Sequence, residues 1–379
     1  MSKQKTRETI SDPDSTVAFG TGVEEEDLLG PAEITEPFDP SQIRVETKTL
    51  TIDLLLTRIR RGEIDLAPDF QRKSDLWKPE AKSRLIESIL VRIPLPAFYM
   101  DATDDNRWLV VDGLQRLSTL KSFALDKTLR LSGLEFLQLR GQAFNELPRH
   151  LQRRILETQV TAYLIERGTP PQVKFNIFKR INTGGLPLSA QEIRHALNQG
   201  SATVFLRDLA NAEEFRSATN YGIKDERMAD RECVLRFIAF YLNEARDYKT
   251  PDFDGFLNAT MVRLNAMTDT EREDLGRVFT RSMKAAAAIF GKTAFRKPAA
   301  HWTPINKPLF EAWSVNLARR NEKDMLLLVE RRRDVMRFFA TAMQESDFEK
   351  SVSAATGDPK KVALRFARVS RVIDEVLAQ

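Results

Sequence analysis

The sequence predicts an α+β protein in which a mixed α/β N-terminal part is followed by an α-helical C-terminal part. From Arg44 to about Gly200, short apolar runs typical of strands alternate with segments whose apolar residues recur at helical spacing. After Gly200 the strand patterns almost vanish, while helical periodicity continues. A length of 379 residues provides material for two or three domains. We therefore predict a mixed domain over residues 43–200 and a helical domain over residues 201–379.

Residues 1–42 precede both parts and are predicted to be a disordered acidic arm. They show no apolar periodicity, contain four prolines, and are locally acidic, as at Glu24, Glu25 and Glu26. A segment of this composition buries too little apolar surface to offset the entropy that it would lose on ordering.

The mixed part is predicted to alternate strands and helices. Apolar and β-branched residues indicate strands at 45–50, 97–100, 108–111 and 159–165. Helices are expected after Thr51, near Pro79, after Gly113, near Val173 and after Ser189, where Glu192 completes a capping box. In the C-terminal part, helical periodicity covers residues 231–242, 274–290, 308–317, 324–339 and 362–377.

Composition excludes several classes of protein. No apolar run approaches the roughly 20 residues that span a bilayer, and the polar N-terminus does not resemble a secretory signal. The single cysteine, Cys233, excludes a disulfide framework and a thiolate metal cluster, and its apolar surroundings predict a buried thiol. We therefore expect a cytoplasmic protein with no membrane partner. The net charge of +4 permits an anionic partner without requiring one.

Residues 112–116, Asp-Gly-Leu-Gln-Arg, form the most distinctive local pattern. An apolar strand runs into a glycine, and a helical pattern begins at once. The start of a helix exposes main-chain N–H groups that favour an anion, while Arg116 and Gln115 add a guanidinium and an amide donor. Asp112 suits the orientation of an arginine or the binding of a metal ion. The same residues also fit a tight strand-to-helix turn, with Asp112 as a cap and Arg116 in solvent.

A second cluster lies at residues 65–72. Pro68 and Phe70 stiffen a loop that ends in another glutamine–arginine pair, Gln71 and Arg72. Two such pairs in separate loops could hold one phosphate chain. A surface loop anchored by its aromatic residues is the alternative.

The third cluster follows the helix predicted near Val173. Basic residues, Lys179 and Arg180, occupy its last turn, and the helix stops at Asn182, Thr183, Gly184 and Gly185. Asn182 and Thr183 can donate to phosphate or join the oxygen shell of Mg²⁺. A helix C-cap followed by an N-cap explains the residues equally well. None of the three clusters matches a P-loop or a dinucleotide fingerprint.

Other catalytic sets are weak. The histidines, His150, His195 and His301, are far apart in the sequence and lack metal-ligand spacing. His195 is interpreted as a surface histidine, or as a neighbour of the site because it follows the Gly184–Gly185 break. Arginine and lysine runs, as at residues 58–61 and 331–333, fit either a nucleic-acid backbone or solvated helix surfaces.

Taken in order, these clusters resemble the N-terminal domain of GmrSD-type restriction endonucleases, which belongs to the wider ParB/sulfiredoxin-like fold. The resemblance rests on residues 69–72, 85–96, 112–116 and 180–192, and it spans roughly residues 45–197. It implies a domain that binds a nucleoside triphosphate and often hydrolyses it, in bacterial DNA restriction or phage defence. ParB-like folds also serve nucleic-acid functions.

The resemblance also implies roles for single residues. It assigns catalytic roles to Asp112, Gln115 and Arg116, and Asp112 and Asn182 are the candidate ligands of a Mg²⁺ ion bound with the triphosphate. The expected nucleotide-binding residues are Phe70, Gln71, Arg72, Gly113, Arg180, Asn182, Thr183, Gly184 and Gly185.

Two departures from the family shape the functional prediction. Leu114 stands where the family commonly has glutamine, so we predict nucleotide binding and leave hydrolysis open. The helical part lacks the histidine-containing HNH nuclease motif that often follows, so a separate nuclease subunit is expected to cut DNA. The alternatives are a DNA-binding module that uses the same basic groove without nucleotide turnover, and a scaffold that binds neither ligand.

Overall fold

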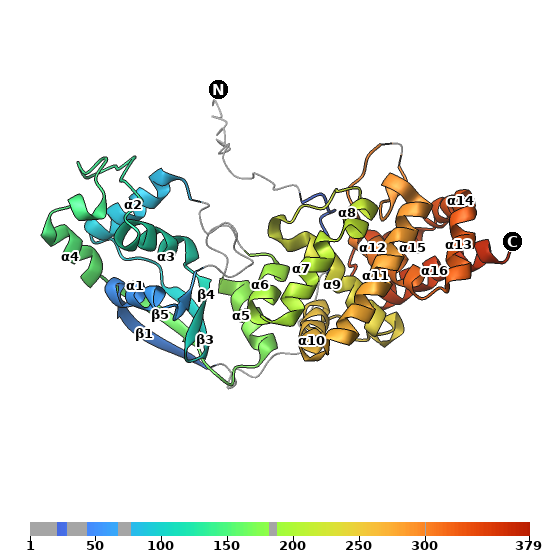
Figure 1. Ribbon diagram of the computed structural model, residues 1–379, viewed down its shortest axis with the longest axis horizontal. Helices are drawn as coiled ribbons and strands as arrows, with labels where there is room; N and C mark the ends of the chain where they lie inside the picture. Colours follow the sequence, from blue (N-terminus) through green and yellow to red (C-terminus); the bar gives the residue numbers. More distant parts are fainter. Residues whose placement is uncertain (1–20, 29–43, 67–76, 182–187, 300) are drawn as a thin grey trace, which may run out of the picture.

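The computed structural model describes residues 21–28, 44–66, 77–181, 188–299 and 301–379. It is elongated, with a sheet-containing half and a helical half side by side along the long axis (Figure 1). Helices α5 (Pro171–Ile181) and α6 (Ala190–Leu197) lie between the two halves. The predicted α+β class and the order of its two parts are confirmed.

The N-terminal half is built on a mixed five-stranded sheet with the strand order β1-β5-β3-β4-β2. Parallel pairing joins β5 to β3 and β4 to β2, whereas β1 with β5 and β3 with β4 are antiparallel. The strands are β1 (Val45–Thr51), β2 (Ile64–Asp65), β3 (Phe98–Asp104), β4 (Arg107–Asp112) and β5 (Gln159–Ile165).

Alternation along these strands divides the sheet into two faces with different covers. The first face, which includes Met100, Val110 and Ala162, packs into one apolar core with the helices of the N-terminal half. These helices are α1 (Ile52–Arg60), α2 (Pro79–Leu90), α3 (Leu114–Leu120), its π-helical extension η2 (Lys121–Leu125), and α4 (Arg149–Glu157). On the second face, Val111 and Ile165 pack against α5 and α6.

The helical half is formed by α7 to α16 around a core that centres on α9 and α12. Cys233 lies fully buried in this core, as predicted, and burial raises the pKa of its thiol to about 12. The helices are α7 (Ser201–Asn211), α8 (Glu213–Ala218), α9 (Ala229–Leu242), α10 (Phe253–Ala266), α11 (Asp269–Phe290), α12 (Lys307–Ala318), α13 (Glu322–Glu330), α14 (Arg332–Ala342), α15 (Ser346–Ser353) and α16 (Pro359–Leu377). No helix of the described residues is long and apolar enough to cross a membrane.

One predicted helix was wrong in its extent. Residues 324–339 were expected to form a single helix, but the chain breaks at Arg331, which ends α13 and precedes α14. The guanidinium of Arg331 donates to the carbonyl oxygen of Val376 at the end of α16. The helical periodicity of the sequence continues across Arg331, so it predicted one helix. The contact with Val376 joins residues far apart in the chain and could not be predicted from this local pattern.

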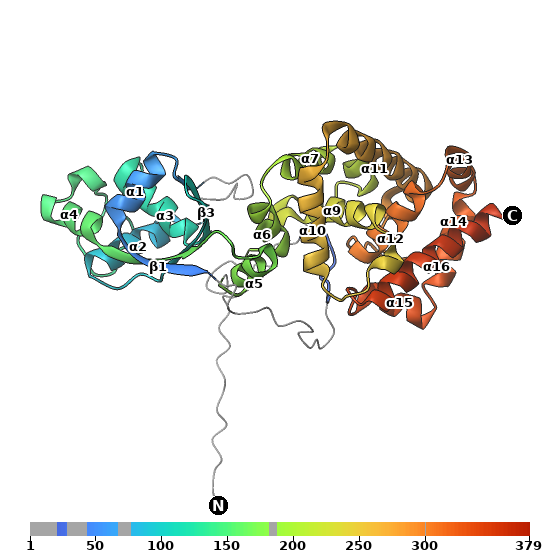
Figure 2. The same cartoon turned by 90° about the horizontal axis from the view of Figure 1, so that it is seen from below.

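Residues 21–28, which we call the strap, correct the prediction of a disordered arm. The strap lies within the helical half, where Val23 forms a parallel bridge with Ile305 (Figures 1 and 2). Further main-chain hydrogen bonds run from Thr356 to Asp27 and from Gly357 to Leu28, each 2.9 Å long. The rest of the predicted arm lies outside the described residues.

The acidic side chains that suggested disorder are the groups that bind the strap. The Glu26 carboxylate accepts hydrogen bonds from Arg236 of α9 at 2.5 and 3.1 Å, and the Arg236 side chain is completely buried. Burial raises the pKa of Glu26, but the charges of Arg236 and Lys307 outweigh burial and hold this pKa below its usual range. Glu24 pairs with Lys297 at 2.7 Å. Composition gives the number of acidic residues, but it does not show whether the folded chain contains a buried cation that pairs with them.

We predict that Glu26→Gln destabilises the helical half. The substitution keeps the size of the side chain and removes the charge that faces the buried Arg236, so we expect a loss of about 1–3 kcal/mol in the free energy of unfolding. Urea unfolding followed by tryptophan fluorescence measures this loss. Glu25→Gln is the matched control, because Glu25 is exposed on the same strap. Equal stability of the two variants would contradict the role assigned to Glu26.

Candidate functional site

The candidate site is centred on residues 112–116, which we call the β4–α3 turn. Here β4 ends at Asp112 and α3 begins at Leu114, as the sequence predicts. Gly113 between them has a φ of +98°, a conformation that side-chain-bearing residues rarely adopt. A Cβ at this position would lie 2.4 Å from the ring of Phe98. Glycine is therefore required by both backbone conformation and space.

Arg116 is buried rather than solvated. Its guanidinium donates to the Asp112 carboxylate at 2.9 Å, to the carbonyl oxygen of Ala97 at 3.1 Å, and to that of Pro96. It also lies 4.5 Å from the ring centre of Phe98. Burial lowers the pKa of Arg116, and Asp112 opposes this shift. Arg116 thus ties the start of α3 to the segment that enters β3, and Asp112 orients an arginine, one of the two roles that its position suggested.

The two residues between Gly113 and Arg116 point in different directions. Leu114 is buried in the apolar core of the N-terminal half, so it adds no polar group to the turn. Gln115 is half-buried at the start of α3. The catalytic roles predicted for Asp112, Gln115 and Arg116 stay predictions.

The second sequence cluster begins beside the same end of the sheet. Phe70, Gln71 and Arg72 themselves lie outside the described residues. The segment that contains them follows β2, which pairs in parallel with β4 so that Asp65 lies opposite Leu109. Because parallel strands have their carboxyl ends at the same edge of a sheet, this segment leaves the sheet on the side where β4 runs into Gly113.

The residues that flank the third cluster, in α5 and at Leu188, also lie beside β4. Asn182, Thr183, Gly184 and Gly185 lie outside the described residues, whereas Arg180 is exposed in the last turn of α5. Leu188, which follows them, packs against two small apolar clusters, one that contains Val111 and one against which Leu109 also packs. The described flanks of all three clusters therefore border β4 near its carboxyl end.

A carboxylate of the helical half holds both helices that flank the third cluster. Asp254 of α10 accepts from Lys179 of α5 at 3.0 Å and from Arg194 of α6 at 2.7 Å. Arg194 is almost completely buried and also donates to Gln191 at 2.9 Å. Sequence reasoning missed this contact, because 75 and 60 residues separate the partners and no local pattern links them.

A second buried ion pair fixes α5 on the sheet. The Lys174 ammonium of α5 donates to the Asp101 carboxylate at 3.1 Å and to the hydroxyl of Thr103, both on β3. Lys174 is 8% exposed. A cation buried to this degree requires a partner, so this pair sets where α5 crosses the sheet. No local pattern in the sequence predicted this pair either.

Histidine and metal chemistry receive no further support in the described part of the chain. His195 is buried on α6, so its interpretation as a surface histidine was wrong. No group of three or more histidine, cysteine, aspartate or glutamate side chains in the described residues could hold a metal ion. The predicted Mg²⁺ ligands are Asn182, outside these residues, and Asp112, which pairs with Arg116.

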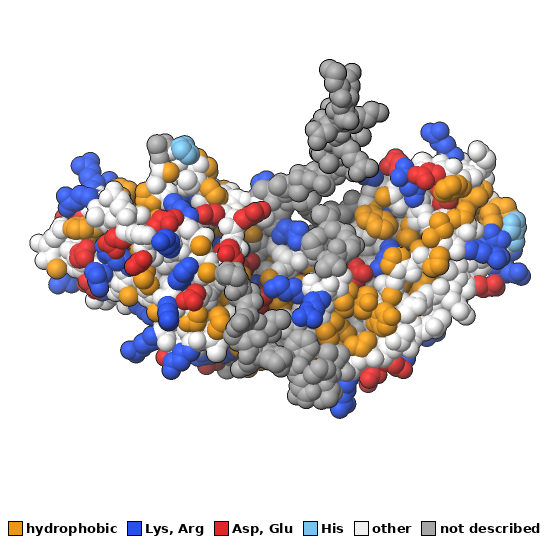
Figure 3. Space-filling view, turned by 180° about the vertical axis from the view of Figure 1, so that it is seen from behind, with side chains coloured by type: hydrophobic (Ala, Val, Ile, Leu, Met, Phe, Trp, Pro, Cys, Tyr) orange, Lys and Arg blue, Asp and Glu red, His pale blue; other side chains and the backbone are white. Residues whose placement is uncertain are grey.

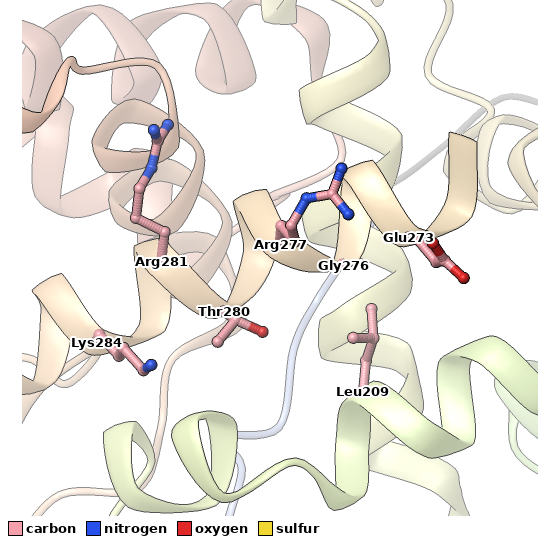
Figure 4. A pocket seen from close by; sticks show the side chains of 7 residues that line it. All are labelled: Leu209, Glu273, Gly276, Arg277, Thr280, Arg281 and Lys284. Atoms are coloured by element: carbon pink, nitrogen blue, oxygen red, sulfur yellow. The ribbon is translucent and has the colours of Figure 1, made fainter. Parts of the chain in front are cut away.

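A groove in the helical half is a separate feature. It has a volume of about 560 Å³ and lies beside α11, where Arg277, Arg281 and Lys284 line it with Leu209 of α7 (Figure 4). Its cations already have partners: Arg277 pairs with Asp274, Lys284 with Glu214, and Arg281 donates to a main-chain carbonyl. Acidic and basic side chains are likewise interspersed over the face of the helical half in Figure 3. This balance makes the groove a poor phosphate site.

Comparison with known families settles what the N-terminal half is. Residues 52–198 match the model of the GmrSD restriction endonuclease, N-terminal domain. This segment is a GmrSD N-terminal domain. The match covers about two-fifths of the chain and includes β2 to β5 and α1 to α6. The chain matches no curated protein and no solved structure.

The match ends at residue 198, just after α6, which Asp254 of the helical half contacts. Its last helix, α6, contacts the helical half through Arg194, and the match includes the β4–α3 turn. The resemblance predicted from ordered motifs is confirmed. The helical half lies outside the match.

We predict that Gly113→Ala destabilises the domain more than Gly62→Ala does. Both glycines have positive φ, +98° and +75°, but a Cβ at Gly62 meets no atom within 4 Å. Gly62→Ala should cost about 1 kcal/mol from backbone strain alone, whereas Gly113→Ala adds overpacking against Phe98 and should cost about 2–4 kcal/mol. Urea unfolding of the two variants tests this difference. Equal losses would show that the close approach to Phe98 is unimportant.

Proposed function

We propose that the GmrSD N-terminal domain binds a nucleoside triphosphate with Mg²⁺ at the β4–α3 turn, as the nucleotide-binding component of a DNA restriction or phage-defence system. The observation that carries this proposal is the arrangement of the flanks. Three sequence clusters rich in arginine, glutamine and asparagine start from or return to the carboxyl end of β4. Donors from three separate segments are what a triphosphate requires.

Each of the three segments contributes side chains that contact the triphosphate or its Mg²⁺ ion. Gln71 and Arg72 contact the phosphate chain from the segment after β2, and Gln115 and Arg116 contact it from the β4–α3 turn. Asn182 and Thr183 approach from the segment after α5 and, with Asp112, complete the oxygen shell of Mg²⁺. Arginine suits this role because its planar guanidinium can donate two parallel hydrogen bonds to one phosphate.

The contacts of Arg116 are compatible with this role. A guanidinium has five N–H donors, and Arg116 donates three bonds to Pro96, Ala97 and Asp112. Two of its donors have no acceptor among the residues that the structure describes. Arg116 is thus fixed in place by the fold before a nucleotide binds, which lowers the entropy cost of binding.

Nucleotide binding also provides a route to the helical half. The segment that carries Asn182 is flanked by α5 and α6, and Asp254 of α10 holds both helices. If α5 and α6 have two arrangements, a nucleotide that binds one of them more tightly shifts the equilibrium towards that arrangement. Asp254 would transmit the change to α10. Leu114 removes a polar group from the turn, so binding rather than rapid hydrolysis is the proposed activity, and DNA cleavage belongs to a separate nuclease subunit.

A second candidate function is a DNA-binding module without nucleotide turnover. The observation that favours it is the number of protein acceptors that Arg116 already has, because an arginine of this kind serves the fold without any ligand. In that case the exposed cations near the turn, such as Arg180, would contact the phosphate backbone of DNA, and binding would weaken steeply with salt.

A screen of ATP, GTP, CTP and UTP with Mg²⁺, with and without DNA, separates the two functions. We expect at least one nucleotide to bind, and Arg72→Ala and Arg116→Ala to weaken binding at least tenfold, because each removes a charged donor worth about 1.5–3 kcal/mol. Urea unfolding is measured alongside, since Arg116 also supports the fold. Salt-dependent DNA binding with no nucleotide binding would favour the second function and contradict the first.

We predict that Asp254→Asn weakens nucleotide binding from a distance. Lys179 and Arg194 lose the charge that holds α5 and α6, so the segment between them is positioned less well, and the affinity should fall about five- to tenfold, or ~1 kcal/mol. Asp247→Asn is the control, because Asp247 is exposed and makes no side-chain ion pair among the described residues. An unchanged affinity in a folded Asp254→Asn protein would disprove this coupling.

A further inference from the structure

The second face of the sheet carries a row of side chains that leads away from the β4–α3 turn. The strand registers place Asp112 of β4 opposite Tyr99 of β3, Tyr99 opposite Tyr163 of β5, and Tyr163 opposite Thr47 of β1. Residues opposite each other on neighbouring strands project to the same face. The pairing of Tyr99 with Asp112 falls at a β-bulge, where Val111, the residue before Asp112, packs in the same apolar cluster as Tyr99. The row therefore crosses the second face from the predicted phosphate site to the edge strand β1.

The rings of the two tyrosines in this row stack on each other. Their ring centres are 4.8 Å apart and their planes differ by 26°. This separation equals the roughly 4.8 Å between adjacent strands, so the rings stack along the direction in which the strands follow one another. Tyr99 turns its outer face towards β4 and is partly covered by the cluster around Phe175, whereas the outer face of Tyr163 is turned towards β1.

The side chains beside Tyr163 on β1 are small. Thr47 and Thr49 on β1 are short and exposed, and β1 is the edge of the sheet. The hydroxyls of Tyr163, Thr47 and Thr49 take part in none of the hydrogen bonds found among the residues that the structure describes. A flat aromatic surface with unused hydroxyls at its border thus lies at the side of the sheet away from α1 to α4. We call Tyr163, Thr47 and Thr49 the aromatic shelf.

The chemistry of the shelf suits a planar, uncharged group. Lys174, which packs on this face from α5, is buried and paired with Asp101, so its charge is already neutralised by a protein partner. An aromatic ring offers stacking to any nucleobase, and threonine hydroxyls can both donate to and accept from its polar edge. Phosphates would therefore be held at Arg116 of the β4–α3 turn and the base at the shelf.

We propose that the base of the bound nucleotide stacks on the outer face of Tyr163, above Thr47. This inference rests on the proposed nucleotide binding and adds where the base lies and how it is recognised. Two strand spacings, about 10 Å, separate the Asp112 and Tyr163 backbones, and a third brings the total to about 14 Å at Thr47. An extended nucleoside triphosphate covers such a span, with its sugar passing the hydroxyl edges of the tyrosines. Because hydroxyls adapt to donors and acceptors alike, the shelf discriminates weakly among the four bases.

The test compares a nucleoside triphosphate with inorganic tripolyphosphate, which lacks sugar and base. Each is titrated against the full chain with Mg²⁺, in the wild type and in Tyr163→Ala. We expect Tyr163→Ala to lower the affinity for the nucleotide about ten- to hundredfold, the usual effect of removing one stacking ring, and to leave the tripolyphosphate affinity unchanged. Tyr163→Phe keeps the ring and should bind as the wild type does.

Two further variants secure the result. Thr47→Phe fills the space above the edge strand with a ring that β-strands accept well, so it should block the base even if Tyr163→Ala fails to fold. Tyr221→Ala removes an exposed tyrosine of the helical half and should change neither affinity.

Wild-type nucleotide affinity in folded Tyr163→Ala or Thr47→Phe protein would overturn the shelf while leaving the phosphate site intact. If the wild type binds tripolyphosphate as tightly as the nucleotide, the base has no site and the shelf is again wrong. Failure of the wild type to bind either ligand would overturn the proposed nucleotide binding and the shelf together.

Discussion

The buried guanidinium of Arg116 is the interaction on which the N-terminal half depends. It joins the end of β4 through Asp112, the entry to β3 through the carbonyl groups of Pro96 and Ala97, and the first turn of α3, which carries it. Gly113 makes this possible, because only a residue without a side chain permits the close approach to Phe98. A charged group so enclosed must keep its partners, since an unpaired buried charge costs several kcal/mol. The turn is therefore held in place by its own buried contacts, independently of any ligand.

The same principle connects this platform to the helical half. Asp254 pairs with Lys179 and Arg194, so the helices that leave the sheet are held by a carboxylate from α10. Deeper in the helical half, Arg236 meets Glu232 at 2.8 Å and Glu26 of the strap at 2.5 Å. The charge of Arg194 is among those that lower the pKa of Glu232, so the two groups of ion pairs influence each other. A displacement of Arg194 on α6 would therefore change the electrostatic potential at Glu232. This effect, together with the ion pairs of Asp254, is the physical basis for the proposed link between the nucleotide and the helical half.

The sequence predicted those features that are encoded locally. Apolar alternation located β1, β4 and β5, and the capping box of Ser189 and Glu192 located the start of α6, where the Ser189 N–H donates to the Glu192 carboxylate at 2.6 Å. Features that join distant segments could not be predicted in this way. The strap binds through Glu26 to an arginine 210 residues away, and a composition rich in acidic residues reads the same whether such a partner exists or not. The stacking of Tyr99 on Tyr163 was missed for a similar reason, because only the parallel register of β3 and β5 brings the two rings together.

Hydrogen–deuterium exchange of the full chain with and without a nucleoside triphosphate and Mg²⁺ tests the central claim most directly. The account predicts slower exchange in peptides that contain residues 67–76, 112–120 and 182–190, with a smaller effect in α10 around Asp254. Slower exchange restricted to the helical half, or no change in any of the three segments at saturating nucleotide, would contradict a nucleotide site at the β4–α3 turn.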